Sequence, residues 1–219
     1  MKQVKWIRFL TIFTAMLSIG IRAHAVEVDR YPHLAVMIDE LVLETGIDRK
    51  LLNIWLEDAK IDQSILRIME RPAESLPWHK YQARFLNRKM IQNGKRYLDE
   101  HLGSFLRAER EFGIPPGIVA AIIGVETRYG VVTGRRRVLD SLMTLSLEYP
   151  RRSKFFSSQL KEFLILSSMG ILDPLEIKGS YAGAIGIPQF MPTSYQAYAI
   201  DFDQDGYSDL VDSSVDAIG

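Results

Sequence analysis

A short stretch at the end of an apolar segment decides how this sequence is interpreted. Residues 122–130 read Ile122-Ile123-Gly124-Val125-Glu126-Thr127-Arg128-Tyr129-Gly130. No charged residue precedes Glu126 from position 117 onward, so its carboxyl group is expected at the end of an almost wholly apolar helix. Desolvation beside apolar groups disfavours the ionised form and raises a carboxyl pKa. A glutamate that stays partly protonated near neutral pH can donate a proton, as cleavage of a glycosidic bond requires.

The apolar residues on both sides of this stretch recur at helical spacing. Gly46 is expected to end the first helix, Asp48 and Asp62 to cap the next two, and Pro116 to begin the helix of Glu126. The predicted helices cover residues 34–42, 51–56, 65–69, 78–85, 89–112, 116–126, 138–147, 153–168 and 194–198. Residues 215–219 are predicted to form the first turn of another helix, capped by Asp216 or Ser214. We expect this turn to be too short to bury a side chain. We therefore expect one all-α domain.

The N-terminus has the pattern of a secretory signal. Residues 1–25 combine a basic start with a mostly apolar run and a small-x-small pattern that ends at Ala25. The apolar run is shorter than the roughly 20 residues that a membrane-spanning helix needs. We predict cleavage after Ala25, export to the periplasm and one domain over residues 26–219; a retained N-terminal anchor is the alternative.

Composition excludes several classes of protein and site. The chain has no cysteine, which excludes disulfides, thiolate metal sites, a cysteine nucleophile and a lipid-modified cysteine after the signal. Residues 26–219 carry a net charge of −4, and no basic block indicates a nucleic-acid surface. His33, His79 and His101 lie on separate segments, so we expect neither a serine triad nor a zinc site.

Two interpretations of Glu126 follow from its neighbours. It can be a structural glutamate that caps a helix or pairs with Arg128, or it can be an acid in a substrate site. Gly124 and Gly130 keep bulk away from both sides of the carboxylate, which suits the close approach of a ligand. Tyr129 offers an aromatic ring and a hydroxyl beside it, and aromatic faces suit sugar rings. These neighbours favour a substrate site.

A second candidate element is rich in glycine and other small residues. Residues 179–192 read Gly179-Ser180-Tyr181-Ala182-Gly183-Ala184-Ile185-Gly186-Ile187-Pro188-Gln189-Phe190-Met191-Pro192. Small side chains let the backbone approach a substrate or another segment closely, and Ser180 and Gln189 are the polar groups in this wall. Tight packing between a helix and a loop is the structural alternative. Together with Glu126, the pattern predicts one wall of a substrate groove.

An acidic loop follows the glycine-rich segment. Residues 201–212 read Asp201-Phe202-Asp203-Gln204-Asp205-Gly206-Tyr207-Ser208-Asp209-Leu210-Val211-Asp212. Carboxylates at loop positions one, three and five, with glycine at six, are typical of an EF-hand calcium loop; a solvated acidic loop is the alternative. The predicted ligands of a structural Ca²⁺ are Asp201, Asp203, Asp205, the backbone carbonyl of Tyr207, and either Asp212 or Asp216.

These motifs occur in an order that resembles the B-type lytic murein transglycosylases. The resemblance extends from about Leu34 to Gly219. It also includes Leu145-Ser146-Leu147-Glu148-Tyr149-Pro150-Arg151-Arg152 and Val215-Asp216-Ala217-Ile218-Gly219. It implies a lysozyme-like all-α fold, related to goose-type lysozyme, with a glycine-rich groove wall and an EF-hand-like loop. It also implies a catalytic domain whose C-terminal part, with Asn and Tyr residues of the active site, lies beyond Gly219.

The resemblance implies cleavage of the β-1,4 bond between N-acetylmuramic acid (NAM) and N-acetylglucosamine (NAG) in peptidoglycan. Glu126 would act as the single general acid and base, and the C6 hydroxyl of the muramoyl residue would close onto C1 to give a 1,6-anhydro end. The resemblance places Ser180 beside this acid, Gln189 along the groove and Tyr81 at a sugar, and it favours Asp216 as the last Ca²⁺ ligand. From the residues themselves we identify no second carboxylate of the kind that ordinary glycosidases use.

Three other functions remain open at this point. They are a muramidase that uses water, a non-catalytic peptidoglycan-binding or scaffold protein, and a calcium-dependent interaction module. The expected partners are peptidoglycan glycan strands. No nucleic-acid partner and, after removal of the signal, no membrane span is expected.

Overall fold

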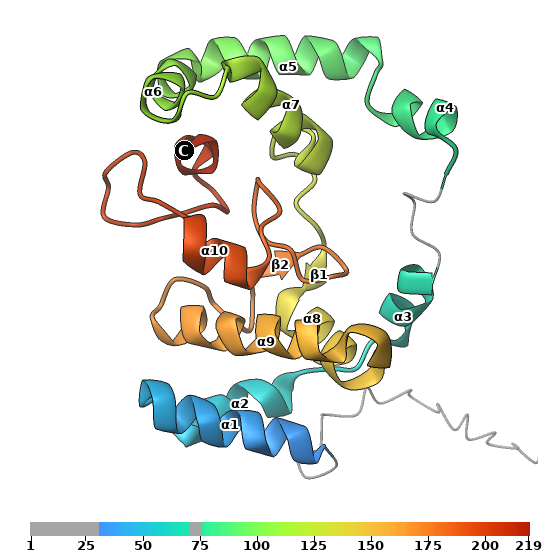
Figure 1. Ribbon diagram of the computed structural model, residues 1–219, viewed down its shortest axis with the longest axis vertical. Coiled ribbons are helices and arrows are strands. Elements are labelled where there is room, and N and C mark those ends of the chain that lie inside the picture. Colours follow the sequence, from blue (N-terminus) through green and yellow to red (C-terminus); the bar gives the residue numbers. More distant parts are fainter. Residues whose placement is uncertain (1–30, 71–75) are drawn as a thin grey trace, which may run out of the picture.

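A computed structural model describes residues 31–70 and 76–219 of the chain (Figure 1). The predicted signal at 1–25 lies outside these residues, so cleavage after Ala25 stays a prediction. Within the described residues the fold is mostly helical, which confirms the expected class. It also contains a two-stranded sheet that the sequence did not predict. None of the helices in these two ranges is long and apolar enough to cross a membrane.

The first helical layer joins the N-terminal helices to two central ones. It consists of α1 (Pro32–Thr45), α2 (Arg49–Asp58), α3 (Gln63–Glu70), α8 (Val138–Glu148), the 3-10 turn η4 (Pro150–Arg152) and α9 (Ser153–Ser168). In Figure 1, α1 and α2 lie beneath α8 and α9. Their apolar faces form the larger core, which includes Leu41, Leu52, Leu142, Phe156 and Phe163.

The predicted turn signals act in this layer as expected. Gly46 ends α1 with a φ of 73°, in the left-handed region that glycine adopts at little cost. The Asp48 side chain accepts a hydrogen bond from the Lys50 backbone N–H and so caps α2. Asp62 accepts one from the Ser64 N–H at the start of α3. Local sequence therefore specifies these helix ends.

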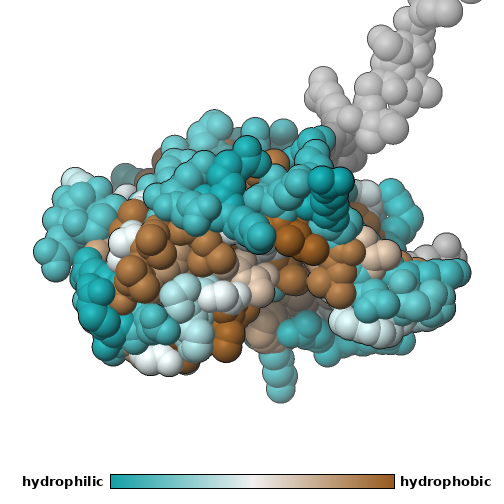
Figure 2. All heavy atoms as spheres, turned by 90° about the horizontal axis from the view of Figure 1, so that it is seen from above, coloured by the Kyte–Doolittle hydropathy of each residue, from teal (hydrophilic) through white to brown (hydrophobic). Residues whose placement is uncertain are grey.

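The second layer carries the helix of Glu126. It consists of α4 (Trp78–Tyr81), the 3-10 turn η3 (Gln82–Arg84), α5 (Arg88–Glu100), α6 (Leu102–Phe112) and α7 (Pro116–Thr127). A second core lies under α5, α6 and α7 and includes Tyr97, Phe105, Ile123, Ile187, Phe202 and Ile218. Seen from this side, hydrophobic residues gather between hydrophilic ones at the surface (Figure 2). On α7 the exposed hydrophobic residues are Ile118, Ile122 and Val125.

Between the two helical layers lie the glycine-rich segment and, at the left edge of the view in Figure 1, the acidic loop. Its regular elements are β1 (Arg136–Arg137), β2 (Lys178–Gly179), α10 (Pro192–Tyr198) and α11 (Ser214–Ile218). The strands pair antiparallel, with Arg136 opposite Gly179. The buried Tyr195 hydroxyl donates to the Ser208 carbonyl at 2.7 Å and accepts from the Leu210 N–H at 3.2 Å. This tyrosine therefore fixes the acidic loop to α10.

The long helix predicted at 89–112 is wrong, because the chain breaks at His101. This residue has φ −114° and ψ 22°, outside the helical region, and it separates α5 from α6. Tyr97 before the break and Phe105 after it both pack in the second core, with ring centroids 6.0 Å apart. Histidine is tolerated in helices, but Gly103 and Ser104 directly after it favour a helix poorly. These two residues were the available local signal for the break.

The prediction for the C-terminal turn is also wrong in its details. The cap of α11 is Ser213, which accepts from the Asp216 N–H, rather than Ser214 or Asp216. The turn was expected to be too short to bury a side chain, yet Asp216 and Ile218 are both buried. Ile218 belongs to the second core, alongside Phe202. The turn therefore packs under the helical layer of Glu126.

Gly124 makes room for a side chain of the protein itself, and not for a ligand as expected. Its missing side chain makes room for Tyr129: a Cβ at Gly124 would lie 2.6 Å from the Tyr129 hydroxyl oxygen, and one at Gly94 would lie 2.4 Å from it. The tyrosine ring thus fills the space between α5 and α7. Close approach of a ligand does not explain this glycine.

We expect Gly124→Ala to lower the free energy of unfolding by about 1–3 kcal/mol, because the added methyl group overpacks the Tyr129 ring, which Gly94 confines from the other side. Urea unfolding followed by circular dichroism measures the change. Gly117→Ala is the matched control in the same helix, because a Cβ at Gly117 would meet no atom within 4 Å. Equal stability of the two variants would contradict this account of the packing.

Candidate active site

Glu126 lies in the last turn of α7, at the edge between two apolar faces. Ile123 on one side is buried and Ile122 on the other is exposed, and both precede Glu126 by about one helical turn. The glutamate itself is exposed to solvent. Partial desolvation by its surroundings nevertheless raises the pKa of its carboxyl group above the ordinary value. The direction expected from the sequence is therefore confirmed.

The structural alternative for Glu126 required a cap or a partner such as Arg128. Arg128 instead ends α7 in the left-handed conformation, with φ 54° and ψ 46°. Desolvation alone accounts for the raised pKa of Glu126, with no contribution from a nearby charge among the described residues. The carboxyl group is thus available to a ligand.

Thr127, which the sequence did not single out, fixes the end of α7. Its side chain is fully buried, and its hydroxyl donates to the Ile187 carbonyl of the glycine-rich segment at 2.8 Å. The same oxygen accepts from the Gly130 N–H at 3.0 Å. A threonine next to a helix end is a frequent source of such side-chain to backbone bonds, and that was the available signal. Through Thr127, the residue next to Glu126 is bonded to the predicted wall.

Two further contacts bring the wall to the segment that follows Glu126. The Gln189 amide nitrogen donates to the Thr133 carbonyl at 3.0 Å and to the Gly186 carbonyl at 2.8 Å. A Cβ at Gly134 would lie 1.9 Å from the Gly179 carbonyl oxygen, so the two backbones touch. The predicted tight packing of this segment is present, and it coexists with the predicted wall.

Ser180 organises the turn in which it lies. Its side-chain oxygen accepts from the Ala182 N–H at 3.2 Å and from the Ala184 N–H at 3.0 Å. The hydroxyl hydrogen is not used in these two bonds and can be donated to a ligand. Ser180 directly follows β2, which pairs with β1, so the strand pair sets its position.

The two predicted tyrosines are placed differently. Tyr81 is half-buried, and its ring contacts Trp78 and Phe85 at centroid distances of 6.3 and 5.2 Å. No hydrogen bond of the described residues joins it to Glu126. Tyr129 packs between α5 and α7 against Tyr97 at 5.4 Å, and desolvation raises its pKa. Its ring therefore serves the packing of α7.

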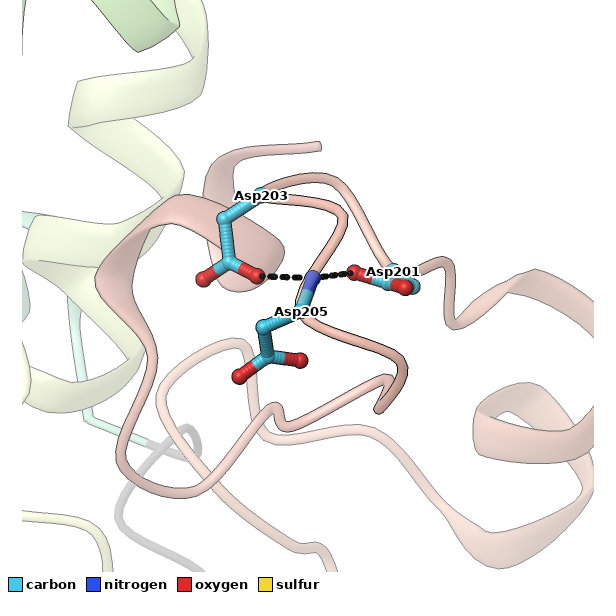
Figure 3. Close-up of side chains that lie close together, drawn as sticks. All are labelled: Asp201, Asp203 and Asp205. Atoms are coloured by element: carbon cyan, nitrogen blue, oxygen red, sulfur yellow. Dashed lines mark hydrogen bonds between the residues drawn. The ribbon is translucent and has the colours of Figure 1, made fainter.

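Three aspartates of the acidic loop come together (Figure 3). Ligand atoms of Asp201, Asp203 and Asp205 all lie within 4.8 Å of one another. The Asp205 N–H donates to carboxylate oxygens of both Asp201 and Asp203, at 3.0 and 3.2 Å. Close carboxylates repel one another unless a cation lies between them, and oxygen donors suit Ca²⁺. The residues present thus fit a hard cation.

Asp216 forms different hydrogen bonds from the three aspartates of this cluster. It is buried, and one of its oxygens accepts from the Phe202 and Asp203 N–H groups at 2.8 and 3.1 Å. The other accepts from the Asp209 N–H at 2.7 Å. Both oxygens are therefore engaged with backbone. Asp212 is exposed, and its carboxylate forms no hydrogen bond with the described residues.

The all-α fold, with an acid at the exposed end of an apolar helix and a glycine-rich segment bonded to it, defines a lysozyme-like protein. Comparison with known sequences gives the family: the model of the Transglycosylase SLT domain matches residues 30–219. The chain belongs to this family.

Relatives agree with this assignment. The chain is 42% identical over 198 residues to membrane-bound lytic murein transglycosylase B of Escherichia coli (strain K12). The aligned region covers 86% of this chain and 55% of the relative. It thus spans about half the length of that protein.

Solved structures of lytic transglycosylases are similar to this chain. Lytic transglycosylase SLT35 of Escherichia coli, solved in complex with bulgecin A and with calcium, is 42% identical with a TM-score of 0.82, over 90% of this chain and 63% of that one. SltB3 of Pseudomonas aeruginosa, solved with NAG-NAM-pentapeptide, is 29% identical with a TM-score of 0.76. The match covers 85% of this chain and 50% of the SltB3 chain.

We expect Thr127→Val to lower the free energy of unfolding by about 1–3 kcal/mol, because it keeps the shape but leaves the Ile187 carbonyl and the Gly130 N–H without their partner. Chemical denaturation monitored by tryptophan fluorescence measures the loss. Thr127→Ser retains the hydroxyl and serves as the control. A valine variant as stable as the serine variant would show that the hydroxyl bonds do not hold the end of α7.

Proposed function

We propose that the chain is a peptidoglycan lytic transglycosylase that cleaves the β-1,4 bond between NAM and NAG. The observation that carries this proposal is Glu126, an exposed carboxyl group whose pKa is raised by desolvation, with no contribution from a charged group of the described residues. Membership of the transglycosylase SLT family supports the same reaction. Relatives named as lytic transglycosylases extend well beyond the length matched here, so the activity is proposed for this domain.

In the proposed reaction Glu126 acts twice. Its protonated carboxyl group donates to the glycosidic oxygen as the bond from that oxygen to C1 of NAM breaks. The resulting carboxylate then accepts the proton of the C6 hydroxyl, whose oxygen bonds to C1. The products are a chain with a free NAG hydroxyl and a 1,6-anhydro-NAM end, and no water is consumed. A raised pKa favours the first step, because the group must be protonated to begin.

Other residues are proposed to bind the glycan around this acid. Ser180 can donate its free hydroxyl hydrogen, and Gln189 holds the adjoining turn against the segment after Glu126. Tyr81 offers a half-buried ring on α4. Tyr129 is proposed to act mainly through packing, because its hydroxyl lies against Gly94 and Gly124.

The acidic loop is proposed to bind Ca²⁺ in a structural role. Asp201, Asp203 and Asp205 would supply carboxylate oxygens, and Tyr207 its backbone carbonyl. The SLT35 structure with calcium supports this choice of ion. We propose Asp216 as the closing ligand, with Asp212 as the alternative. The Asp216 oxygen that accepts only from the Asp209 N–H keeps a lone pair for a cation.

We propose that the protein acts on peptidoglycan glycan strands in the periplasm. The signal pattern at 1–25 supports export, with cleavage after Ala25 and a lytic transglycosylase domain over 26–219. A retained N-terminal anchor is the competing arrangement, and the name of the membrane-bound relative is consistent with it. The absence of cysteine excludes a lipid-modified cysteine.

We expect Glu126→Gln to lower the release of anhydro-muropeptides by at least about 100-fold, because it keeps the shape but removes the proton donor. Mass spectrometry of products released from purified peptidoglycan measures the loss. Activity of the parent chain should fall as pH rises through the raised pKa of Glu126, since only the protonated form can donate.

The control is Glu109→Gln, an exposed carboxylate on α6, which should release product normally. Near-normal release by Glu126→Gln would contradict the assignment. Products heavier by one water would indicate a muramidase. Binding of glycan by the parent chain with no released product would favour a scaffold protein.

We expect Asp201→Ala combined with Asp205→Ala to abolish the rise in melting temperature that Ca²⁺ gives the parent chain, because two carboxylate ligands are lost. Asp212→Ala should leave both this rise and the melting temperature in chelator unchanged; a reduced rise in that variant would instead identify Asp212 as the closing ligand. Asp216→Ala should reduce the rise and lower the melting temperature in chelator as well, since three backbone N–H groups lose their acceptor. A parent chain that melts equally with Ca²⁺ and with chelator would refute the site.

A further inference from the structure

A small basic pocket lies where the segment after Glu126 meets the start of α5. Its volume is about 220 Å³, and its lining includes the cations Arg84, Lys89 and Arg128 together with Asn87 and Asn93. Among the described residues, no acidic side chain lines it. A water molecule in the liquid occupies about 30 Å³, so the space suits a small polar group such as a carboxylate with its nearest atoms.

The cations of this pocket are free to bind a ligand. Arg84, Lys89 and Arg128 are exposed, and none of them forms an ion pair with a residue of the described ranges. Three like charges around one space repel one another and attract an anion. Guanidinium groups in particular match carboxylates in shape and hydrogen-bond geometry.

The two asparagines complete a set of donors. The Asn87 side chain accepts from the Met90 N–H and donates to the Arg84 carbonyl, so it holds the pocket rim in place. The oxygen of Asn93 accepts from the Arg96 guanidinium at 2.7 Å. This bond leaves the Asn93 amide nitrogen without a partner among the described residues, and an amide nitrogen can only donate. The polar lining thus offers donors to an acceptor ligand.

The position of the pocket identifies the ligand. Arg128 follows Glu126 by two residues, and the Tyr129 ring packed between Gly94 and Gly124 holds α5 against α7. In the proposed reaction the bond that breaks is at C1 of NAM, the sugar that carries the peptide stem. The peptide therefore begins within one sugar of Glu126, and any peptide carries carboxylate groups.

We infer that Arg84, Lys89 and Arg128 form a pocket that binds a carboxylate of the peptide stem attached to the glycan substrate. This inference rests on the proposed function, because it uses the position of NAM at Glu126. The pocket would make the protein prefer peptide-bearing strands over strands from which the peptides have been removed.

The test measures binding, so that it does not depend on cleavage. The parent is Glu126→Gln, which leaves the glycan intact. The probes are a NAG-NAM tetrasaccharide with its peptide stems and a NAG tetrasaccharide. The second probe is peptide-free and also lacks the lactyl carboxylate that removal of the peptides would expose on NAM. Titration calorimetry at low and at high salt gives the dissociation constants.

We expect Arg84→Gln combined with Lys89→Gln to weaken binding of the peptide-bearing probe by roughly tenfold, since two charge-assisted contacts are lost. Binding of the peptide-free probe should not change, and salt should weaken only the former. Neither side chain forms a hydrogen bond within the described residues, so the fold should be unaffected, as circular dichroism can verify. Arg88→Gln, an exposed cation of α5 outside the pocket lining, should leave both affinities unchanged.

Equal weakening of both probes, an equal loss with Arg88→Gln, or no loss would each overturn the inference. A parent without preference for the peptide-bearing probe would overturn it as well. Absence of cleavage by the chain with Glu126 intact, combined with the predicted binding preference, would contradict the proposed function and leave the carboxylate pocket standing.

Discussion

The hydrogen bond from the buried Thr127 hydroxyl to the Ile187 carbonyl is the contact on which the arrangement of the site depends. It joins the last turn of α7 to the glycine-rich segment, which lies 60 residues away in sequence. Ile187 in turn donates its N–H to the Leu210 carbonyl at 2.8 Å. Three segments are thus connected through one short chain of bonds. Glu126 precedes this junction by one residue, so its position is set by buried contacts although its own carboxyl group is exposed.

The same junction relates the acidic loop to the helix of Glu126. Asp216 binds three backbone N–H groups of the loop, and Ile218 packs with Phe202 in the core under α7. A cation held by Asp201, Asp203 and Asp205 would therefore stiffen a loop that already supports this core. Since none of these groups is bonded to Glu126, this arrangement supports a role for the ion in stability rather than in proton transfer.

Local signals in the sequence predicted most of the helices and the chemical character of the site. Gly46, Asp48 and Asp62 mark helix ends through their own backbone preferences or side-chain bonds, and Glu126 is recognisable because the apolar residues that precede it belong to the same helix. The break at His101 was missed because a single glycine within a helical pattern, here Gly103, does not by itself show whether the helix ends. Gly124 was misinterpreted for a different reason: the residue that fills its space depends on how α5 and α7 pack. The substrate contacts assigned to Tyr81, Ser180 and Gln189 stay predictions.

The surroundings of Glu126 on α7 suit the proposed double role of its exposed carboxyl group as acid and base. A group that must release a proton and take one back needs a pKa near the working pH, and strong burial or a charged partner would move it too far. Glu126 is flanked by a buried isoleucine and an exposed one, which gives partial desolvation without an ion pair. Arg128 ends α7 in the left-handed conformation and lines the basic pocket, and no charged group of the described residues contributes to the pKa of Glu126. The sequence Glu126-Thr127-Arg128-Tyr129 therefore places a carboxyl group, a buried anchor, a cation of the basic pocket and a packing ring on four successive residues.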